Sequence, residues 1–244
     1  MLKIAHIENN LMEKFGIPRQ SGLAPSSLST IVFEPEYRNP DALRGLEDFS
    51  HIWLIWEFDR KKPESPGFTD DRDANALRPD EPETGKSWSP TVRPPKLGGN
   101  TRMGVFATRS PNRPNPIGLS CVKLVSIEDS ERGPLITVSG ADLMNGTSIL
   151  DIKPYLPYAD SHPEATGGFT DNTCADTPLE IVDPEGVLDT LDSDTRRAIE
   201  ELLLLDPRPG YHDDPERIYG MRYGNLDIHF TVQYKTITIL YISR

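Results

Sequence analysis

The sequence predicts a mainly β protein, in which a β-barrel-like N-terminal domain is followed by a small α+β C-terminal domain. Strands and long helices do not alternate regularly along the chain, which argues against a doubly wound parallel sheet. Four short segments of the first half are β-branched or alternating and are bounded by turn residues, as strands are: 28–34, 51–58, 119–128 and 134–140. A closed or nearly closed barrel therefore fits the first half best.

The connections between these strands differ in character. The stretch NPDALRGLEDF, after the first strand, offers Asp41 as a helix N-cap and one or two helical turns. Residues 59–86 are charged, rich in proline and poor in aliphatic side chains. We therefore expect a long insertion there that contributes little to the core.

The C-terminal region predicts a helix and a hairpin. The stretch DSDTRRAIEELLLLD has apolar residues at helical spacing and offers Asp192 or Ser193 as a cap. Further on, LDIHFTVQYKTITILYIS is typical of two strands with a turn near Tyr234 to Thr236. The chain is therefore expected to divide into three parts: a barrel domain over 1–160, a linker over 161–178 and the α+β domain over 179–244.

Composition places the chain among globular proteins. Its 244 residues are 36% hydrophobic, which is enough for a real core. The N-terminus has no unbroken apolar segment and no later run approaches the length of a membrane span, so we expect a cytoplasmic protein without membrane contact. Cys121 and Cys174 lack paired spacing, which argues against disulfides and against a metal site. The glycine-rich motifs of the standard nucleotide-binding folds are missing as well.

Charge is distributed unevenly along the chain. The net charge of −12 counts against nucleic acid as a partner, because phosphate binding draws on Lys and Arg. Residues 86–127, however, hold seven Lys and Arg and no Asp or Glu. This cationic segment is either a solvated face, with its counter-charges elsewhere in the fold, or an anion-binding surface.

The loop GVFATRSPNRPNPIGLS lies within the cationic segment. Pro111, Pro114 and Pro116 fix φ at three positions and push the preceding residues into extended conformations. Arg109 and Arg113 supply planar guanidinium groups that suit a carboxylate or a phosphate. The loop is thus either pre-organised for an anion or a rigid turn whose arginines pair with acidic neighbours.

Several stretches of the sequence together resemble one known family. They are EKFGIPRQSGL, GLEDFSHIWLIW, TVRPPKLGGNTRMGVFATRSPNRPNPIGLS, DLMNGTSILDIKPYLPYAD and DPRPGYH. Their wording and order are similar to those of the TrmO family, also called TsaA-like or YaeB-like proteins, chiefly over residues 10–160. The resemblance implies an S-adenosylmethionine-dependent tRNA methyltransferase on a β-barrel rather than a Rossmann fold. It implies methylation of N6 of N6-threonylcarbamoyladenosine beside the anticodon, in the anticodon stem-loop, by a protein that is typically a homodimer.

Carried over position by position, the resemblance also implies a set of cofactor contacts. They come from distant parts of the chain, as a site at the mouth of a barrel requires: Ser21, Gly22, Leu23, Asp59, Arg60, Arg109, Leu119, Ile149, Leu150, Asp151 and Ile152. A His often stands in relatives where this chain has Asp59 and Arg60, so the sequence departs from the family pattern at that contact.

The chemistry of the implied reaction favours a proton acceptor. The target is a ureido nitrogen conjugated to a purine, which is a poor nucleophile until it loses its proton. Asp151 is the candidate base, and Tyr155 is a positioning group or an alternative acceptor. Asp151 is equally compatible with a role as the partner of an Arg or Lys. His51 stands alone at a strand start, a position that is more often structural.

Three cations of the cationic segment have no implied cofactor contact, and we expect them to face tRNA phosphates: Lys96, Arg102 and Arg113. The residues leave two other functions open. A non-catalytic RNA- or anion-binding barrel would carry the same cations but would have no reason to hold a sulfonium cofactor. A methyltransferase that acts on a small molecule is favoured by the acidic net charge.

Overall fold

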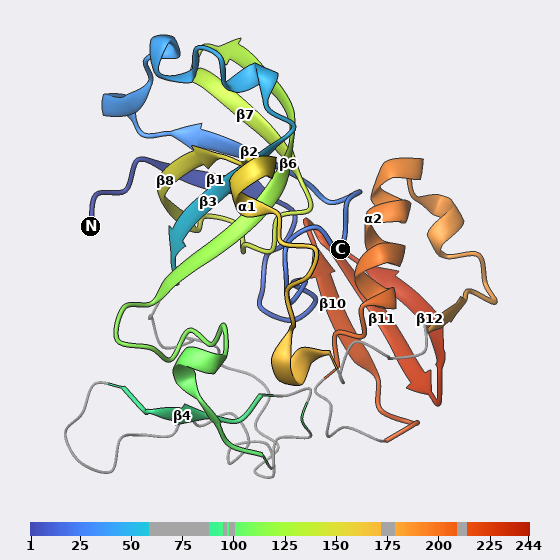
Figure 1. The fold of residues 1–244 in the computed structure, drawn as a ribbon. Helices are drawn as coiled ribbons and strands as arrows, with labels where there is room; N and C mark the ends of the chain where they lie inside the picture. The colour runs from blue at the N-terminus through green and yellow to red at the C-terminus, as the bar shows by residue number, and fades with distance from the viewer. Residues whose placement is uncertain (59–87, 95–96, 98–100, 172–178, 209–213) are drawn as a thin grey trace.

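The structure is a computed structural model, and it describes residues 1–58, 88–94, 97, 101–171, 179–208 and 214–244. These residues are mainly β, as predicted, and form a closed barrel, a four-stranded sheet and a two-stranded sheet. In Figure 1 the barrel lies at the upper left and the four-stranded sheet lies with its helix at the right. The predicted insertion over 59–86 lies outside the described residues, as does Cys174.

Antiparallel strands close the barrel in the order β1-β2-β7-β6-β3-β8. Their bounds are β1 Ala5–Asn9, β2 Leu28–Phe33, β3 His51–Glu57, β6 Ile117–Ser130, β7 Gly133–Ser139 and β8 Ser148–Pro154. The predicted barrel and the four predicted strands β2, β3, β6 and β7 are thus confirmed. Strands β1 and β8 were not predicted from the sequence. Strand β1 has only five residues, of which two are buried and apolar, and a bulge breaks the alternation of β8.

The barrel core is built by residues that alternate along the strands. In β3, Ile52, Leu54 and Trp56 are buried inside, while the residues between them are partly buried on the outer face. The indole of Trp56 lies against Gly118 of the neighbouring β6, where a Cβ would come within 2.2 Å of a ring carbon. Glycine is therefore required at that position by the shape of the core.

Strand β8 carries one extra residue, Leu150, because successive residues of β3 pair with Asp151 and Ile149. A bulge of this kind shifts the alternation of side chains by one position. Ile149 and Ile152 consequently both pack in the barrel core, although a regular strand would place them on opposite faces.

The connection between β2 and β3 forms the predicted helical turns as short 3-10 helices: η1 Pro35–Tyr37, η2 Pro40–Leu43 and η3 Leu46–Asp48. The prediction of Asp41 as the N-cap is wrong. Asn39 caps η2, because its side-chain oxygen accepts a hydrogen bond from the Asp41 N–H at 3.0 Å. The Asp41 carboxylate instead pairs with Arg44 one turn later.

Short elements occupy the remaining connections of the barrel. They are β4 Thr91–Val92, β5 Met103–Gly104, η5 Val105–Ala107, α1 Pro157–Asp160 and η6 Gly168–Thr170. Residues 108–116 of the proline-rich loop form no helix or strand, in agreement with their composition. None of the described helices has the length and apolar character needed to span a membrane.

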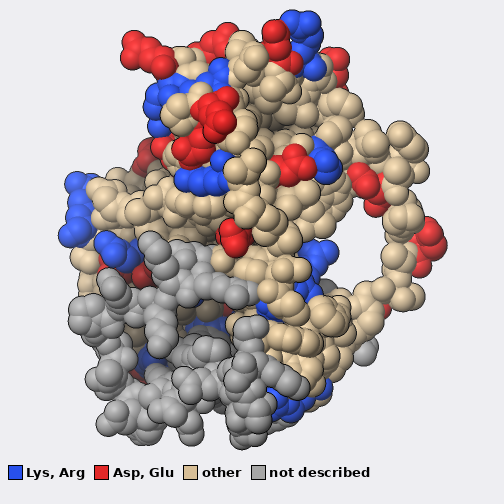
Figure 2. All heavy atoms as spheres, turned by 90° about the vertical axis from the view of Figure 1, so that its left-hand side faces the viewer, with Lys and Arg blue, Asp and Glu red and all other residues tan. Residues whose placement is uncertain are grey.

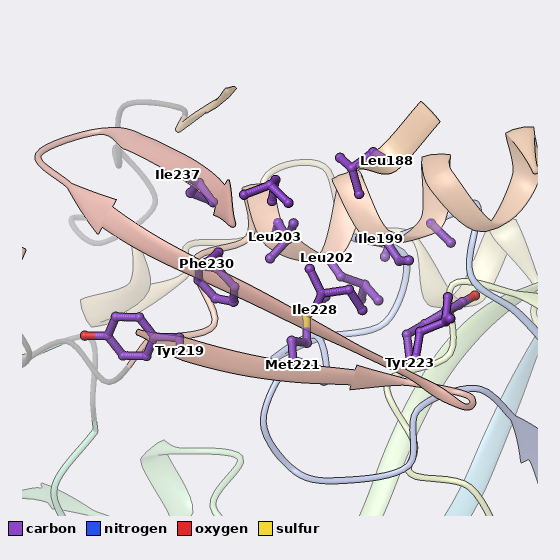
Figure 3. Packing of buried hydrophobic residues seen from close by; sticks show 14 of the residues in the cluster. Leu188, Ile199, Leu202, Leu203, Tyr219, Met221, Tyr223, Ile228, Phe230 and Ile237 are labelled. Atoms are coloured by element: carbon purple, nitrogen blue, oxygen red, sulfur yellow. The ribbon is translucent and has the colours of Figure 1, made fainter. Parts of the chain in front are cut away.

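The C-terminal unit is a sheet with one helix packed on it (Figure 3). The sheet order is β10-β11-β12-β9, with β9 Glu180–Val182, β10 Tyr219–Tyr223, β11 Leu226–Gln233 and β12 Thr236–Ser243. η7 Leu188–Thr190 precedes the helix α2 Ser193–Leu204. The predicted helix and the predicted hairpin, β11 with β12, are therefore confirmed. Asp192, one of the two predicted caps, accepts hydrogen bonds from backbone N–H groups of the first helical turn.

The segment between β1 and β2 belongs to the core of this C-terminal unit. Leu11 and Ala24 are buried in the same hydrophobic cluster as α2, and Leu11 forms an isolated bridge with Tyr223. The Glu201 carboxylate of α2 accepts hydrogen bonds from both the N–H and the hydroxyl of Ser26, each at 2.7 Å. This segment therefore ties the barrel to the C-terminal sheet.

We expect Gly118→Ala to destabilise the protein, because the added Cβ would overlap the Trp56 ring in a closely packed core. Overpacking of this kind lowers the free energy of unfolding by about 1–3 kcal/mol, which urea titration would measure. Gly104→Ala is the matched control, because its φ of −57° suits any residue and an added Cβ meets no atom within 4 Å. Equal stability of the two variants would contradict this account of the core.

Candidate functional site

Two segments predicted to contact the cofactor meet at one end of the barrel. The Arg109 guanidinium donates a hydrogen bond to the side-chain oxygen of Gln20. Gln20 directly precedes the predicted contacts Ser21, Gly22 and Leu23. Sequence reasoning did not select Gln20 itself, although it is the last residue of the PRQ stretch. The contact joins residues that lie 89 positions apart in the chain.

The segment that holds Gln20 is also fixed to the turn after β7. The Gly22 N–H donates to the Gly140 carbonyl at 2.8 Å, and both glycines have positive φ, +80° and +75°. A Cβ on Gly140 would lie 3.0 Å from the Gly22 Cα, so the two backbones are in close contact. Glycine is needed at both positions, since the backbone conformation is one that other residues rarely adopt.

A carboxyl group that the sequence analysis missed lies in the same turn. The Asp142 Oδ1 accepts a hydrogen bond from the Ser120 hydroxyl at 2.5 Å, and the Ser120 Oγ accepts one from the Trp56 Nε1 at 2.9 Å. The pKa of Asp142 is raised above its ordinary value because the carboxyl group is buried, and the Ser120 hydrogen bond and the charge of Arg109 only partly oppose this shift. The sequence did not single out this residue, because an Asp near Gly and Asn is typical of an ordinary turn. Its position between two buried apolar neighbours was the available signal.

We call these groups the barrel-end cluster: Gln20, Gly22, Arg109, Ser120 and Asp142. They come from the segment after β1, the proline-rich loop, β6 and the turn between β7 and β8. The strand register places these four segments at the same end of the barrel, because β2 starts, β7 ends and β6 starts there. A site with both a guanidinium and a carboxylate can bind a ligand that carries both charges.

Other predicted contacts lie in a row across the outer face of three strands. Ile55 of β3 pairs with Leu119 of β6 on one side and with Asp151 of β8 on the other. Leu119 is 52% exposed and is accessible to a ligand. Ile149 differs, because its side chain is fully buried in the barrel core and leaves only its backbone groups for a contact. Ile152 packs against the same core and is partly exposed.

Asp151 and Tyr155, the predicted catalytic pair, have partners within the barrel wall. The Asp151 carboxylate pairs with Lys153 at 2.9 Å and also accepts a hydrogen bond from the Ile152 N–H at 2.9 Å. The Tyr155 ring packs against Trp53, with ring centroids 5.9 Å apart, and against His51. The pairing of Asp151 with a cation, which the sequence left open, is therefore present.

Two of the three cations predicted to face RNA, Arg102 and Arg113, lie within the described residues. The Arg113 guanidinium donates to the carbonyl oxygens of Val105 and Thr108, each at 3.4 Å, and so braces the loop itself. Arg102 donates to the Thr91 hydroxyl at 2.9 Å. Figure 2, which views the left-hand side of Figure 1, shows basic and acidic side chains intermixed over the barrel in its upper part. The predicted site residues Asp59, Arg60 and Lys96 lie outside the described residues.

Family models match nearly the whole chain. The model of the tRNA-methyltransferase O N-terminal domain matches residues 6–161, and that of the TrmO C-terminal domain matches residues 186–244. A Pseudomonas aeruginosa protein is 38% identical over 93% of this chain and 90% of its own length. Its name assigns it provisionally to the S-adenosylmethionine-dependent methyltransferases.

Named relatives and solved structures agree with these models. A tRNA (adenine(37)-N6)-methyltransferase of Escherichia coli (strain K12) is 38% identical over 94% of this chain and 92% of that protein. The crystal structure of TrmO from Pseudomonas aeruginosa has a TM-score of 0.70 at 32% identity, and the match covers 99% of this chain and 97% of that one. The chain therefore belongs to the tRNA-methyltransferase O (TrmO) family.

Proposed function

We propose that this protein transfers a methyl group from S-adenosylmethionine to N6 of N6-threonylcarbamoyladenosine beside the anticodon of tRNA. The relative from Escherichia coli, named a tRNA (adenine(37)-N6)-methyltransferase, supports the class of reaction and the position of the base. The structural observation that carries the proposal is the contact between Arg109 and Gln20. This contact brings PRQ, residues 18–20, and ATRS, residues 107–110, to one end of the barrel, although they are distant in sequence.

The residues at this barrel end suit the cofactor. The Arg109 guanidinium fits a carboxylate such as that of the amino-acid part of S-adenosylmethionine. Leu23 and Leu119, which are 48% and 52% exposed, offer apolar surface for an adenine ring. The residues that we propose to hold the cofactor are Ser21, Gly22, Leu23, Asp59, Arg60, Arg109, Leu119, Ile149, Leu150, Asp151 and Ile152.

Catalysis at this site requires positioning and removal of one proton. S-adenosylmethionine supplies an electrophilic methyl group. The acceptor nitrogen must lose its proton as it attacks, and we assign that proton to the Asp151 carboxylate. Tyr155, held against Trp53 and His51, orients the acceptor or takes the proton in its place. Lys153 is near enough to Asp151 to stabilise the carboxylate between turnovers.

We propose that the anticodon stem-loop of tRNA binds along the cationic segment, through Lys96, Arg102 and Arg113. The protein acts in the cytoplasm as a homodimer. Residues 1–160 form the catalytic barrel domain, 161–178 the linker and 179–244 the small α+β domain. The acid-free composition of residues 86–127 supports the RNA surface in a chain whose net charge is −12.

The acceptor is tested by comparing two forms of one tRNA. We expect purified protein with S-adenosylmethionine to methylate tRNA that carries the threonylcarbamoyl group and to leave the unmodified transcript largely unmethylated. The reason is that the ureido group both acidifies the nitrogen and fills part of the pocket. Mass spectrometry of nuclease digests would measure the product. Equal methylation of the two forms would remove the reason for assigning this acceptor.

Arg109 and Arg102 are expected to bind different ligands, the cofactor and tRNA. Arg109→Ala should weaken S-adenosylhomocysteine binding by about 1.5–3 kcal/mol and leave tRNA affinity unchanged, because one charged hydrogen bond to the cofactor is lost. Arg102→Ala should lower tRNA affinity and reduce its salt dependence by about one phosphate contact, without changing cofactor binding. Calorimetry and tRNA binding at two salt concentrations would measure both.

Arg132→Ala is the control for these variants. Arg132 lies in the turn after β6, at the opposite end of that strand from Arg109, and pairs with Glu8 of β1. Its loss should change neither the cofactor affinity nor the tRNA affinity. The assignment would be wrong if Arg109→Ala weakened only tRNA binding, or if Arg102→Ala weakened only cofactor binding.

Asp151→Asn should slow methyl transfer about 10²–10⁴-fold in single-turnover measurements, because the side chain keeps its shape but no longer takes a proton. The rate of methyl transfer should fall far more than the affinity for either the cofactor or tRNA. Asp129→Asn, at an exposed position of β6, is the matched control. A near-normal rate in Asp151→Asn together with a slow Tyr155→Phe variant would move the proton acceptor to Tyr155.

A further inference from the structure

The barrel-end cluster contains a carboxylate to which the proposed function assigns no role. Asp142 lies in the turn between β7 and β8, two residues after Gly140, whose carbonyl binds the Gly22 N–H. The residue is neither fully buried nor fully exposed, and its carboxylate is held by the Ser120 hydroxyl. The same turn therefore places a carboxylate beside the segment that the cofactor is proposed to contact.

The hydrogen bonds around Asp142 fix its role as an acceptor. An indole N–H can only donate, so the Ser120 Oγ accepts from Trp56 and must direct its own proton elsewhere. That proton lies on the 2.5 Å contact with the Asp142 Oδ1. The Ser120 hydroxyl, itself oriented by Trp56, thus donates to Asp142 and partly offsets the burial that raises the pKa of this carboxyl group.

The Arg109 guanidinium acts on the charge of this carboxylate without forming an ion pair with it. Arg109 is close enough to favour the ionised form of Asp142, but the hydrogen bond recorded for its guanidinium goes to Gln20. Burial meanwhile raises the pKa of Asp142, which means that the carboxylate gains from a further cation. A guanidinium and a carboxylate that lie close together without a direct ion pair between them match a ligand that carries both charges.

S-adenosylmethionine carries an ammonium and a carboxylate on one carbon, and its sulfonium adds a second positive charge. Arg109 alone would attract the carboxylate but repel both cationic groups. We propose that Asp142 is a cofactor-binding residue, whose carboxylate binds the α-ammonium group while Arg109 binds the α-carboxylate. The inference rests on the proposed function, because it needs this cofactor at the barrel end.

The proposal is tested by changing the protein and the ligand together. Calorimetry on the full chain would compare S-adenosylhomocysteine with 5′-methylthioadenosine, which lacks the amino-acid part. Asp142→Asn should weaken binding of S-adenosylhomocysteine about 10–100-fold, as expected for a lost charged hydrogen bond, and change binding of 5′-methylthioadenosine less than about two-fold. Asp129→Asn is the matched control and should change neither affinity.

A second measurement begins with the wild-type protein, and that part does not depend on the variant folding. The analogue of S-adenosylhomocysteine without the α-amino group should bind the wild-type protein about 10–100-fold more weakly than S-adenosylhomocysteine. In Asp142→Asn the two ligands should bind alike, because the interaction is removed from either side of the same pair.

The outcomes separate this inference from the proposed function. If Asp142→Asn weakens both nucleosides equally, or neither, and the wild type tolerates loss of the amino group, the inference is overturned while the cofactor assignment stands. If the wild type binds neither S-adenosylhomocysteine nor 5′-methylthioadenosine, the proposed function fails and the inference fails with it.

Discussion

The close packing of the Trp56 indole on Gly118 is the constraint on which the barrel end depends. No side chain separates the indole from β6 at that point, and its Nε1 donates to Ser120 two residues further along the strand. Ser120 passes the connection to Asp142. The turn that carries Asp142 then contacts the segment of Gly22, and that segment binds Arg109 through Gln20. Contacts thus run without interruption from the barrel core to the proposed cofactor residues.

The C-terminal unit contributes to the same site from the other side. The segment that carries Gln20 begins and ends with residues packed in the C-terminal core, Leu11 and Ala24. Ser26 is fixed to Glu201 of α2 by two hydrogen bonds. Both hydrophobic cores therefore determine where the PRQ stretch lies. This arrangement gives the C-terminal unit a structural role at the barrel end, in addition to any contact with RNA.

Local pattern was enough to predict the elements whose hydrophobicity is regular. The alternation in β3, the cap and apolar spacing of α2, and the β11–β12 hairpin were all readable from the sequence. Strand β8 was not, because its bulge at Leu150 places Ile149 and Ile152 on the same face and breaks the period of two. Asn39 took the cap expected of Asp41, a choice between neighbours that propensity alone does not decide.

The site was harder to predict than the fold because long-range pairing assembles it. The family resemblance implied roles for Arg109 and the segment after PRQ. Asp142 and Gln20 lie in two of the same quoted stretches, but their contacts form only when segments distant in sequence lie together. Their chemistry depends on neighbours such as Ser120, which a sequence read along the chain does not reveal.

A crystal structure of the protein with S-adenosylhomocysteine would test the central claim most directly. The account predicts the amino-acid part of the ligand between Arg109 and Asp142, and a ligand bound away from this end of the barrel would contradict it.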